Sequence, residues 1–340
     1  ADHNEPMRDQ PRFADAKWLA RMVAEATDVP RAPAPPRAAE AAHGITGAAL
    51  QGKVFAPIKW IVPDYFVEGL TLLAGKPKLG KSWLALNLAS AVAAGGSAFG
   101  VAGCEAGDVL ALTLEDNERR LQTRMQQMMG ERPWPARVTF HTEWPKLDAG
   151  GREDLESWIE RADKPRLVVV DVWTKVRGRP DGKKTQYADD FDTLAVLQQI
   201  ALRHCIAIVV LHHASKRDNP EDPFDLVSGT TGLTGAADSV MILRKEATQA
   251  DAVLYGRGRD LPVFEKAMRF DTTRGLWSVL GDAETYRLST VEAKVLKVLA
   301  EASEPMRPRD VSEIIDAKAG TVRTTLNRMA RAGTIKDLGR

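Results

Sequence analysis

Short apolar runs alternate with helical patterns from about residue 60 to residue 280. Each run predicts a β-strand. In chain order they read GLTLLAG, GDVLALTLED, ARVTFHT, PRLVVVDV, CIAIVVLHH, ADSVMILRK and DAVLYGRG. The runs around Val170 and Val209 are apolar throughout, which is typical of central parallel strands that are covered on both faces.

Helical patterns separate these strands. They cover residues 82–94, 117–129, 154–162 and 189–204. A series of βαβ units predicts an α/β fold with a mainly parallel central sheet. Two further runs, EKAMRFD and GLWSVLG, follow the last of these strands with little helix between them, so we expect an antiparallel edge there.

The pattern changes after Gly281, and residues 283–340 predict a small helical domain. Three short helices are expected, over residues 290–300, 308–315 and 320–332. This layout is typical of a helix-turn-helix or winged-helix domain, whose third helix would read DNA. Such domains also dock proteins, and the sequence favours neither role.

The N-terminal residues 1–50 read as an arm. Residues 13–27 have the spacing of a short amphipathic helix, and residues 29–44 are too rich in proline and alanine to form a core. The arm is therefore a candidate docking element for replication proteins, and residues 51–282 form the main domain.

Composition narrows the class of protein. The chain has 340 residues, of which 44% are hydrophobic and 27% charged, and its net charge is +1. It has no run of about eighteen apolar residues and no signal-peptide pattern, so we expect a cytoplasmic protein that does not cross a membrane. Cys104 and Cys205 have neither metal-ligand nor disulfide-scaffold spacing. Any nucleic-acid affinity must come from local patches or from a ring that concentrates them.

A phosphate-binding loop follows the first predicted strand of the main domain. The stretch GKPKLGKS matches the spacing G-x-x-x-x-G-K-[ST] between a strand and a helix. Its glycines let backbone N–H groups converge on phosphates, Lys81 can reach the β and γ oxygens of ATP, and the Ser82 hydroxyl can bind Mg²⁺. The predicted nucleotide-binding residues are Gly75, Lys76, Pro77, Lys78, Leu79, Gly80, Lys81, Ser82 and Trp83.

Carboxylates and histidines end the neighbouring strands. Asp171 closes the run LVVVD and is the predicted support for magnesium. Glu115 is the predicted base that orients water; alternatively, Glu115 and Asp116 only begin the following helix near its N-terminal dipole. His212 and His213 point in alternate directions, so only one of them can face the site.

The order of these motifs, completed by SGTTGLTGAADSVMIL, resembles the RecA-like ATPases of the RepA-like hexameric helicase group of plasmids, phages and mobile elements. The resemblance covers roughly residues 57–280. It implies that ATP and magnesium bind at the loop, that Glu115 activates water, that Asp171 supports magnesium and that His213 senses the γ-phosphate. It also implies a hexameric ring, in that group's manner, around single-stranded DNA.

In such rings a neighbouring subunit inserts an arginine into each nucleotide site. Arg257 and Arg259 match the basic-x-arginine pattern of the corresponding strand, and Arg244 is a third candidate. The alternative is a solvated strand edge that is protected by its charge.

Two loops are predicted to contact single-stranded DNA, because they follow strands on the ligand-binding side of the sheet. The first carries Lys175, Arg177, Arg179, Lys183 and Lys184, and the second carries Lys216 and Arg217. Each loop alone can also be a solvated turn. Acidic residues in the second loop weaken its case, so we favour the first.

The leading prediction is an ATP-hydrolysing, ring-forming helicase or translocase on single-stranded DNA. It would serve replication of a plasmid, phage or mobile element. The alternatives are a non-translocating DNA-binding ATPase switch, recombination mediator or regulator, and a loader that docks replication proteins. Primase activity is not expected.

Overall fold

The computed structural model describes residues 44–101, 103–178, 185–214, 222–227, 231–245, 250–302 and 304–337. The chain divides into two compact units, residues 1–56 and 57–340. The described part of the first unit contains helix α2 (Gly47–Gln51), which is capped where the Thr46 hydroxyl accepts a hydrogen bond from the Ala49 N–H. The helix predicted at residues 13–27 lies outside the described residues, as does the proline-rich spacer up to residue 43.

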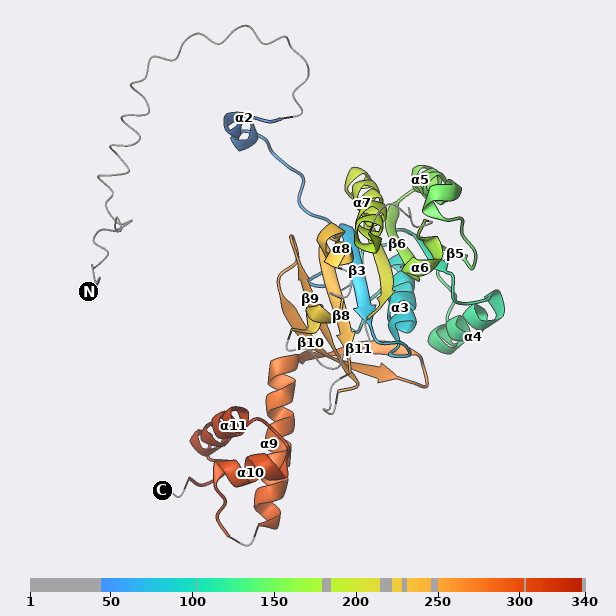
Figure 1. The fold of residues 1–340 in the computed structure, drawn as a ribbon. Helices are drawn as coiled ribbons and strands as arrows, with labels where there is room; N and C mark the ends of the chain where they lie inside the picture. The colour runs from blue at the N-terminus through green and yellow to red at the C-terminus, as the bar shows by residue number, and fades with distance from the viewer. Residues whose placement is uncertain are drawn as a thin grey trace, which may run out of the picture. The chain divides into compact units, whose positions relative to one another are not determined.

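A central sheet dominates the second unit (Figure 1). Within the described residues it has nine strands in the order β11-β10-β9-β8-β3-β7-β6-β4-β5. Their bounds are β3 (Gly69–Gly75), β4 (Asp108–Thr113), β5 (Val138–His141), β6 (Pro165–Asp171), β7 (Ala207–His213), β8 (Ser239–Arg244), β9 (Ala252–Gly258), β10 (Phe264–Asp271) and β11 (Leu276–Asp282). Strands β8 to β5 run parallel, whereas β9, β10 and β11 are antiparallel. The α/β prediction and its antiparallel edge are confirmed.

A short antiparallel pair, β1 (Trp60–Val62) and β2 (Phe66–Val67), precedes the central sheet. The helices that accompany the sheet are α3 (Lys81–Ala94), α4 (Glu118–Met129), α5 (Arg152–Arg161), α6 (Trp173–Val176), α7 (Gln186–His204) and α8 (Thr231–Ala236). Single helical turns cover Leu147–Gly151 and Pro223–Leu226. The observed starts differ from the predicted ones by no more than a few residues.

The core forms two layers because successive strand residues face opposite sides of the sheet. On β3, Leu72 packs in a cluster with the inner faces of α5 and α7, whereas Leu73 packs in a second cluster with α3. α4 then covers α3 from outside through Leu121 and Met125. The sheet is thus buried on both faces, as the apolar strands predicted.

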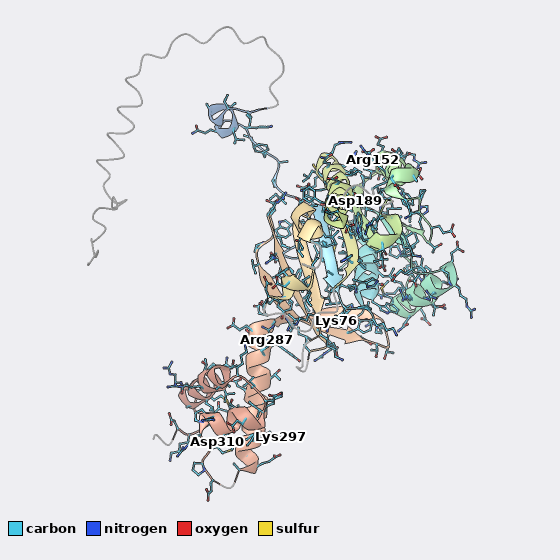
Figure 2. The ribbon with its side chains drawn as sticks, in the orientation of Figure 1. Lys76, Arg152, Asp189, Arg287, Lys297 and Asp310 are labelled. Atoms are coloured by element: carbon cyan, nitrogen blue, oxygen red, sulfur yellow. The ribbon has the colours of Figure 1, made fainter. Side chains whose placement is uncertain are left out.

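Three helices follow the sheet: α9 (Ala283–Glu301), α10 (Pro308–Ile314) and α11 (Ala319–Arg331). They confirm the predicted helical layout, but α9 begins at Ala283 rather than near residue 290. Its first turns are held by the sheet domain, since Ala283 is buried in the core and Arg287, which Figure 2 marks, pairs with Glu265 at 2.8 Å. Among the helices that the structure describes, none is both long and apolar enough to cross a membrane.

Candidate nucleotide-binding site

The chemistry-bearing residues meet at one edge of the sheet. β3, β7, β6 and β4 are parallel, so their carboxyl ends lie together: Gly75 lies opposite His213, and Thr113 lies opposite Asp171. A cavity of about 380 Å³ opens at this edge. Its lining residues are Lys78, Leu79, Gly80, Lys81, Ser82, Trp83, Glu115, Arg124, Asp171, His213, Lys245, Asp251, Phe270, Thr272 and Trp277.

The loop between β3 and α3 has the geometry of a phosphate cradle. Gly80 caps α3 with a φ of 91°, a conformation that favours glycine. At Gly75, a Cβ atom would lie 2.5 Å from the Leu243 carbonyl oxygen, so a side chain would push the loop away from β8. The N-terminus of a fourteen-residue helix therefore points its unpaired N–H groups at the cavity.

Lys81 is held inside the loop. Its Nζ donates hydrogen bonds to the carbonyl oxygens of Gly75 at 2.7 Å and Lys76 at 2.9 Å. Burial lowers the pKa of Lys81 to about 8, although the carboxylates of Asp171 and Glu115 oppose this shift. A cation that is poorly solvated and anchored by two carbonyls is well placed to bind an incoming phosphate.

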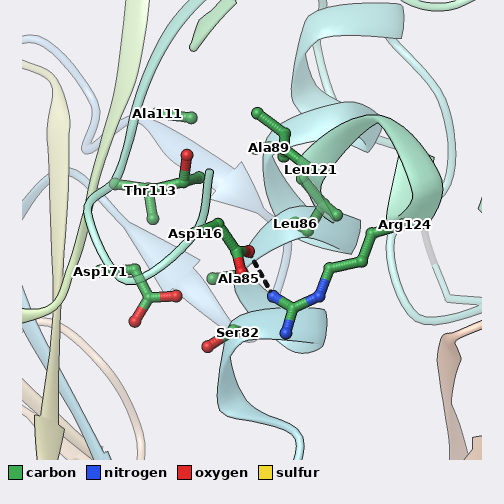
Figure 3. A pocket seen from close by; sticks show the side chains of 11 residues that line it. Ser82, Ala85, Leu86, Ala89, Ala111, Thr113, Asp116, Leu121, Arg124 and Asp171 are labelled. Carbon is green, nitrogen blue, oxygen red and sulfur yellow. Dashed lines mark hydrogen bonds and ion pairs between the residues drawn. The ribbon is translucent and has the colours of Figure 1, made fainter. Parts of the chain in front are cut away.

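Asp171 and Ser82 form a candidate magnesium site (Figure 3). Asp171 is buried, and burial raises the pKa of its carboxyl, while the Ser82 hydroxyl acts in the opposite direction by hydrogen bonding to the carboxylate. A carboxylate and a hydroxyl at the end of a phosphate loop are the oxygen ligands that Mg²⁺ prefers. These residues therefore fit the predicted ion, which would bridge and neutralise phosphate oxygens.

Glu115 and Asp116 have different surroundings. Asp116 is nearly buried and pairs with Arg120 at 3.2 Å and with Arg124 at 2.5 Å, the latter drawn in Figure 3. Glu115 faces the cavity, and its Oε1 lies 3.6 Å from the Nε2 of His213. Asp116 thus has a structural role at the start of α4, and Glu115 keeps the position that the prediction of a base requires.

The two histidines at the end of β7 divide as the strand alternation predicted. His213 lines the cavity, whereas His212 is not among its lining residues. Burial lowers the pKa of His212 to about 4, and the nearby charges of His213, Lys81 and Arg177 act in the same direction. His212 is therefore neutral at pH 7.

This shift predicts a pH-dependent stability. Between the ordinary pKa of 6.5 and the folded value of about 4, the unfolded chain binds a proton that folded His212 does not, so the free energy of unfolding falls as the pH drops. The loss is on the order of 1–3 kcal/mol by pH 4. We expect His212→Gln to lose less stability than the wild type over this interval in urea titrations. Parallel pH profiles for the two proteins would contradict the assignment.

Aromatic residues that the sequence did not single out line the cavity opposite the loop. Trp277 of β11 donates a hydrogen bond from Nε1 to the Gly80 carbonyl at 3.0 Å, and its ring lies 4.9 Å from that of Phe270. Arg124 lies over Trp83 at 5.3 Å. The antiparallel hairpin β10–β11 thus forms a wall of the site. Neither composition nor spacing shows that this hairpin folds back onto the phosphate loop.

Asn87 locks this wall to α3. It is buried, its Oδ1 accepts a hydrogen bond from the Trp277 N–H at 2.7 Å, and its Nδ2 donates to the Gly275 carbonyl at 3.0 Å. Asn87→Ala would leave both backbone groups without these partners. We therefore expect a loss of about 1–3 kcal/mol in the free energy of unfolding. The exposed Asn327 provides the matched control, because Asn327→Ala should change stability little.

The candidate arginines lie at two different edges. β9 runs antiparallel to β8, so Arg257 and Arg259 lie near Ser239, at the edge away from the phosphate loop. Arg257 pairs with Asp222 at 3.4 Å, and Arg259 pairs with Asp238 at 3.2 Å. Arg244 ends β8 and lies at the same edge as its own loop. Their role toward a neighbour stays a prediction.

Two of the predicted DNA-contacting residues fall within the described chain. Lys175 is exposed on α6. Arg177 follows this helix, and its guanidinium lies 3.1 Å from the carboxylate of the buried Asp190, so an internal ion pair holds it. The other candidates, Arg179, Lys183, Lys184, Lys216 and Arg217, lie outside the described residues.

Comparison with known proteins agrees with this geometry. A model of the AAA domain family matches residues 35–219. No curated protein matches the chain. Among solved structures, an isolated ATPase domain aligns with a TM-score of 0.51 and 12% identity, over 63% of this chain and 85% of that one. This likeness confirms the RecA-like fold.

Two other solved structures align with lower scores. A DnaB-like replicative helicase, described with its interactions with primase, gives a TM-score of 0.49 at 12% identity, over 62% of this chain and 57% of that one. A KaiC-like protein from Pyrococcus horikoshii gives 0.43 at 15% identity, over 66% and 99% of the two chains.

Proposed function

Because this chain belongs to the AAA domain family, we propose that it hydrolyses ATP with magnesium and uses the energy as a ring-forming helicase or translocase on single-stranded DNA. In this proposal the ring contains six copies and serves the replication of a plasmid, phage or mobile element. The family and the RecA-like fold support the ATPase part of the proposal. DNA, ring and replicon are inferred from the arrangement of the residues and from the resemblance of the motifs.

The observation that carries the proposal is the division of the machinery between two edges of one sheet. Lys81, Ser82, Asp171 and Glu115 gather at the carboxyl edge of the parallel strands. Arg257, with Arg259 beside it on β9, lies at the opposite edge, where it cannot reach the phosphates of its own chain. A ring that places this edge against the next subunit's cavity would bring an arginine to each nucleotide.

Mixing two inactive variants tests the ring. Arg257→Ala keeps an intact phosphate loop, and Lys81→Ala keeps an intact arginine. If a neighbour supplies the arginine, each protein alone should lack turnover, and their mixture should recover part of it. The same experiment with Arg259→Ala decides between the two candidates. Arg269→Ala, an exposed arginine on β10, controls for the charge change. Full activity of both single variants, or no recovery on mixing, would refute delivery by a neighbour.

Strand displacement tests the helicase. Forked DNA with a 5′ or a 3′ tail is incubated with ATP, and Lys81→Ala serves as the blank. We expect unwinding from one tail polarity only. ATP turnover that DNA stimulates, without displacement from either tail, would instead favour the second candidate.

That second candidate is a non-translocating DNA-binding ATPase switch, mediator or regulator. The observation that favours it is the helical unit α9–α11, which adds a candidate DNA- or protein-binding module to the ATPase domain. In this case ATP binding would control assembly rather than movement. The same nucleotide site serves both candidates, so only the displacement experiment separates them.

A further inference from the structure

The three C-terminal helices form a unit with its own core. Val295 of α9, Val311 of α10, and Val322 and Met329 of α11 are buried against one another. Ile315 completes the cluster at the end of α10. A core shared by all three helices fixes the orientation of α11 within this unit.

α10 and α11 are joined as in a helix-turn-helix. The turn between Ile314 and Ala319 has four residues, a typical length for this motif. Within it, Asp316 has a φ of 49°, in the left-handed region, and the Ser312 hydroxyl donates a hydrogen bond to the Ala317 carbonyl at 2.9 Å. The turn is therefore tight and braced, and α11 occupies the position of the reading helix.

The exposed side of α11 carries side chains that recognise bases and phosphates. The buried side of the helix consists of Val322, Thr325 and Met329. The opposite side is exposed and presents Gly320, Arg323, Thr324, Asn327 and Arg331. Arginine pairs with the guanine edge and asparagine with the adenine edge in the major groove, while threonine suits either a base or a phosphate.

The charge of this segment is one-sided. From residue 317 to residue 336 the sequence contains Lys318, Arg323, Arg328, Arg331 and Lys336 and no acidic residue. Arg328 is held by Glu292 of α9 at 2.5 Å. The acids of the unit lie instead on α9, on α10 and in the turns, for example Asp310 on α10 (Figure 2). A basic helix face complements a polyanion, whereas a face that docks proteins would be expected to expose apolar side chains.

We propose that α11 binds double-stranded DNA in the major groove, with Arg323 and Asn327 contacting base edges and Arg331 contacting phosphate. This site is separate from the single-stranded DNA path of the proposed function. It would attach the ATPase to a chosen duplex while the sheet domain acts on a separated strand. The proposal does not depend on unwinding activity.

Duplex binding by the full-length protein tests this site. The probe is a labelled duplex of about 30 base pairs, long enough for two half-sites one turn apart, and affinity is measured by anisotropy from about 50 to 200 mM salt. We expect Arg323→Ala to weaken binding roughly tenfold, and Arg331→Ala to reduce the slope of log affinity against log salt by about one. Lys297→Ala, which removes the same charge from the exposed face of α9 (Figure 2), should bind as the wild type does.

Sequence selection tests the base contacts. Duplexes with a randomised centre are enriched on the wild-type protein and on Asn327→Ala. A motif that the wild type enriches and the variant relaxes at one position would support reading by α11. Turnover stimulated by single-stranded DNA should be equal in all these variants, so a failure here is distinguishable from a failure of the ATPase proposal.

Two results would overturn the inference. One is duplex affinity in Arg323→Ala and Asn327→Ala that equals that of the wild type and Lys297→Ala. The other is the absence of duplex binding at the lowest salt concentration. Both would assign the unit to protein docking. Because Arg323 and Asn327 are exposed, melting temperatures should not change, which excludes unfolding as the cause of a loss.

Discussion

Lys81→Ala is expected to abolish ATP turnover, with a loss of at least about 10²- to 10³-fold. Lys81 is the buried cation of the phosphate loop, and two backbone carbonyls already fix the position of its ammonium group. Little reorganisation is therefore needed when a triphosphate arrives. Since no other lysine in the loop is buried, no neighbouring side chain can replace this charge at the same point.

The measurement is steady-state phosphate release with and without single-stranded DNA. Lys297→Ala provides the control, because it removes one lysine charge far along the sequence from the loop. The melting temperature of Lys81→Ala should stay close to that of the wild type, since the substitution removes a poorly solvated charge together with its two hydrogen bonds. Normal turnover in a folded Lys81→Ala protein would refute the nucleotide site.

The sequence predicted the carboxyl edge of the site because its parts follow from local rules. Apolar runs mark buried parallel strands, and parallel strands bring their ends together, so Gly75, Asp171 and His213 could be placed at one edge without coordinates. Strand alternation even separated His213 from His212. The phosphate loop needed only its spacing and its flanking strand and helix.

The remaining wall of the site could not be predicted in this way. Trp277 reaches the loop because an antiparallel hairpin folds across the end of α3, and the register of such a hairpin depends on long-range contacts such as those of Asn87. Arg124 belongs to a helix whose many charges resemble a solvated face; only the structure shows that it lies between Asp116 and Trp83. The start of α9 was missed for a similar reason, because Arg287 is held by a strand residue.

Glu115→Gln is expected to keep ATP binding and to lose about 10²- to 10⁴-fold in turnover. Glutamine has almost the same shape as glutamate, so Lys81, Ser82 and Asp171 should still form the binding site. It cannot accept a proton from water, however, and it removes the negative charge that lies 3.6 Å from His213. Binding is measured with a fluorescent ATP analogue and turnover by phosphate release.

Asp116→Asn is the matched comparison, because it makes the same chemical change at the adjacent residue. Asp116 is occupied by Arg120 and Arg124, so its substitution should weaken the start of α4 and lower the melting temperature. If Glu115 and Asp116 only began the helix, both variants would lose stability and neither would lose turnover selectively. If Glu115 is the base, turnover and stability separate: Glu115→Gln folds and binds ATP but is slow, whereas Asp116→Asn is less stable and retains more activity.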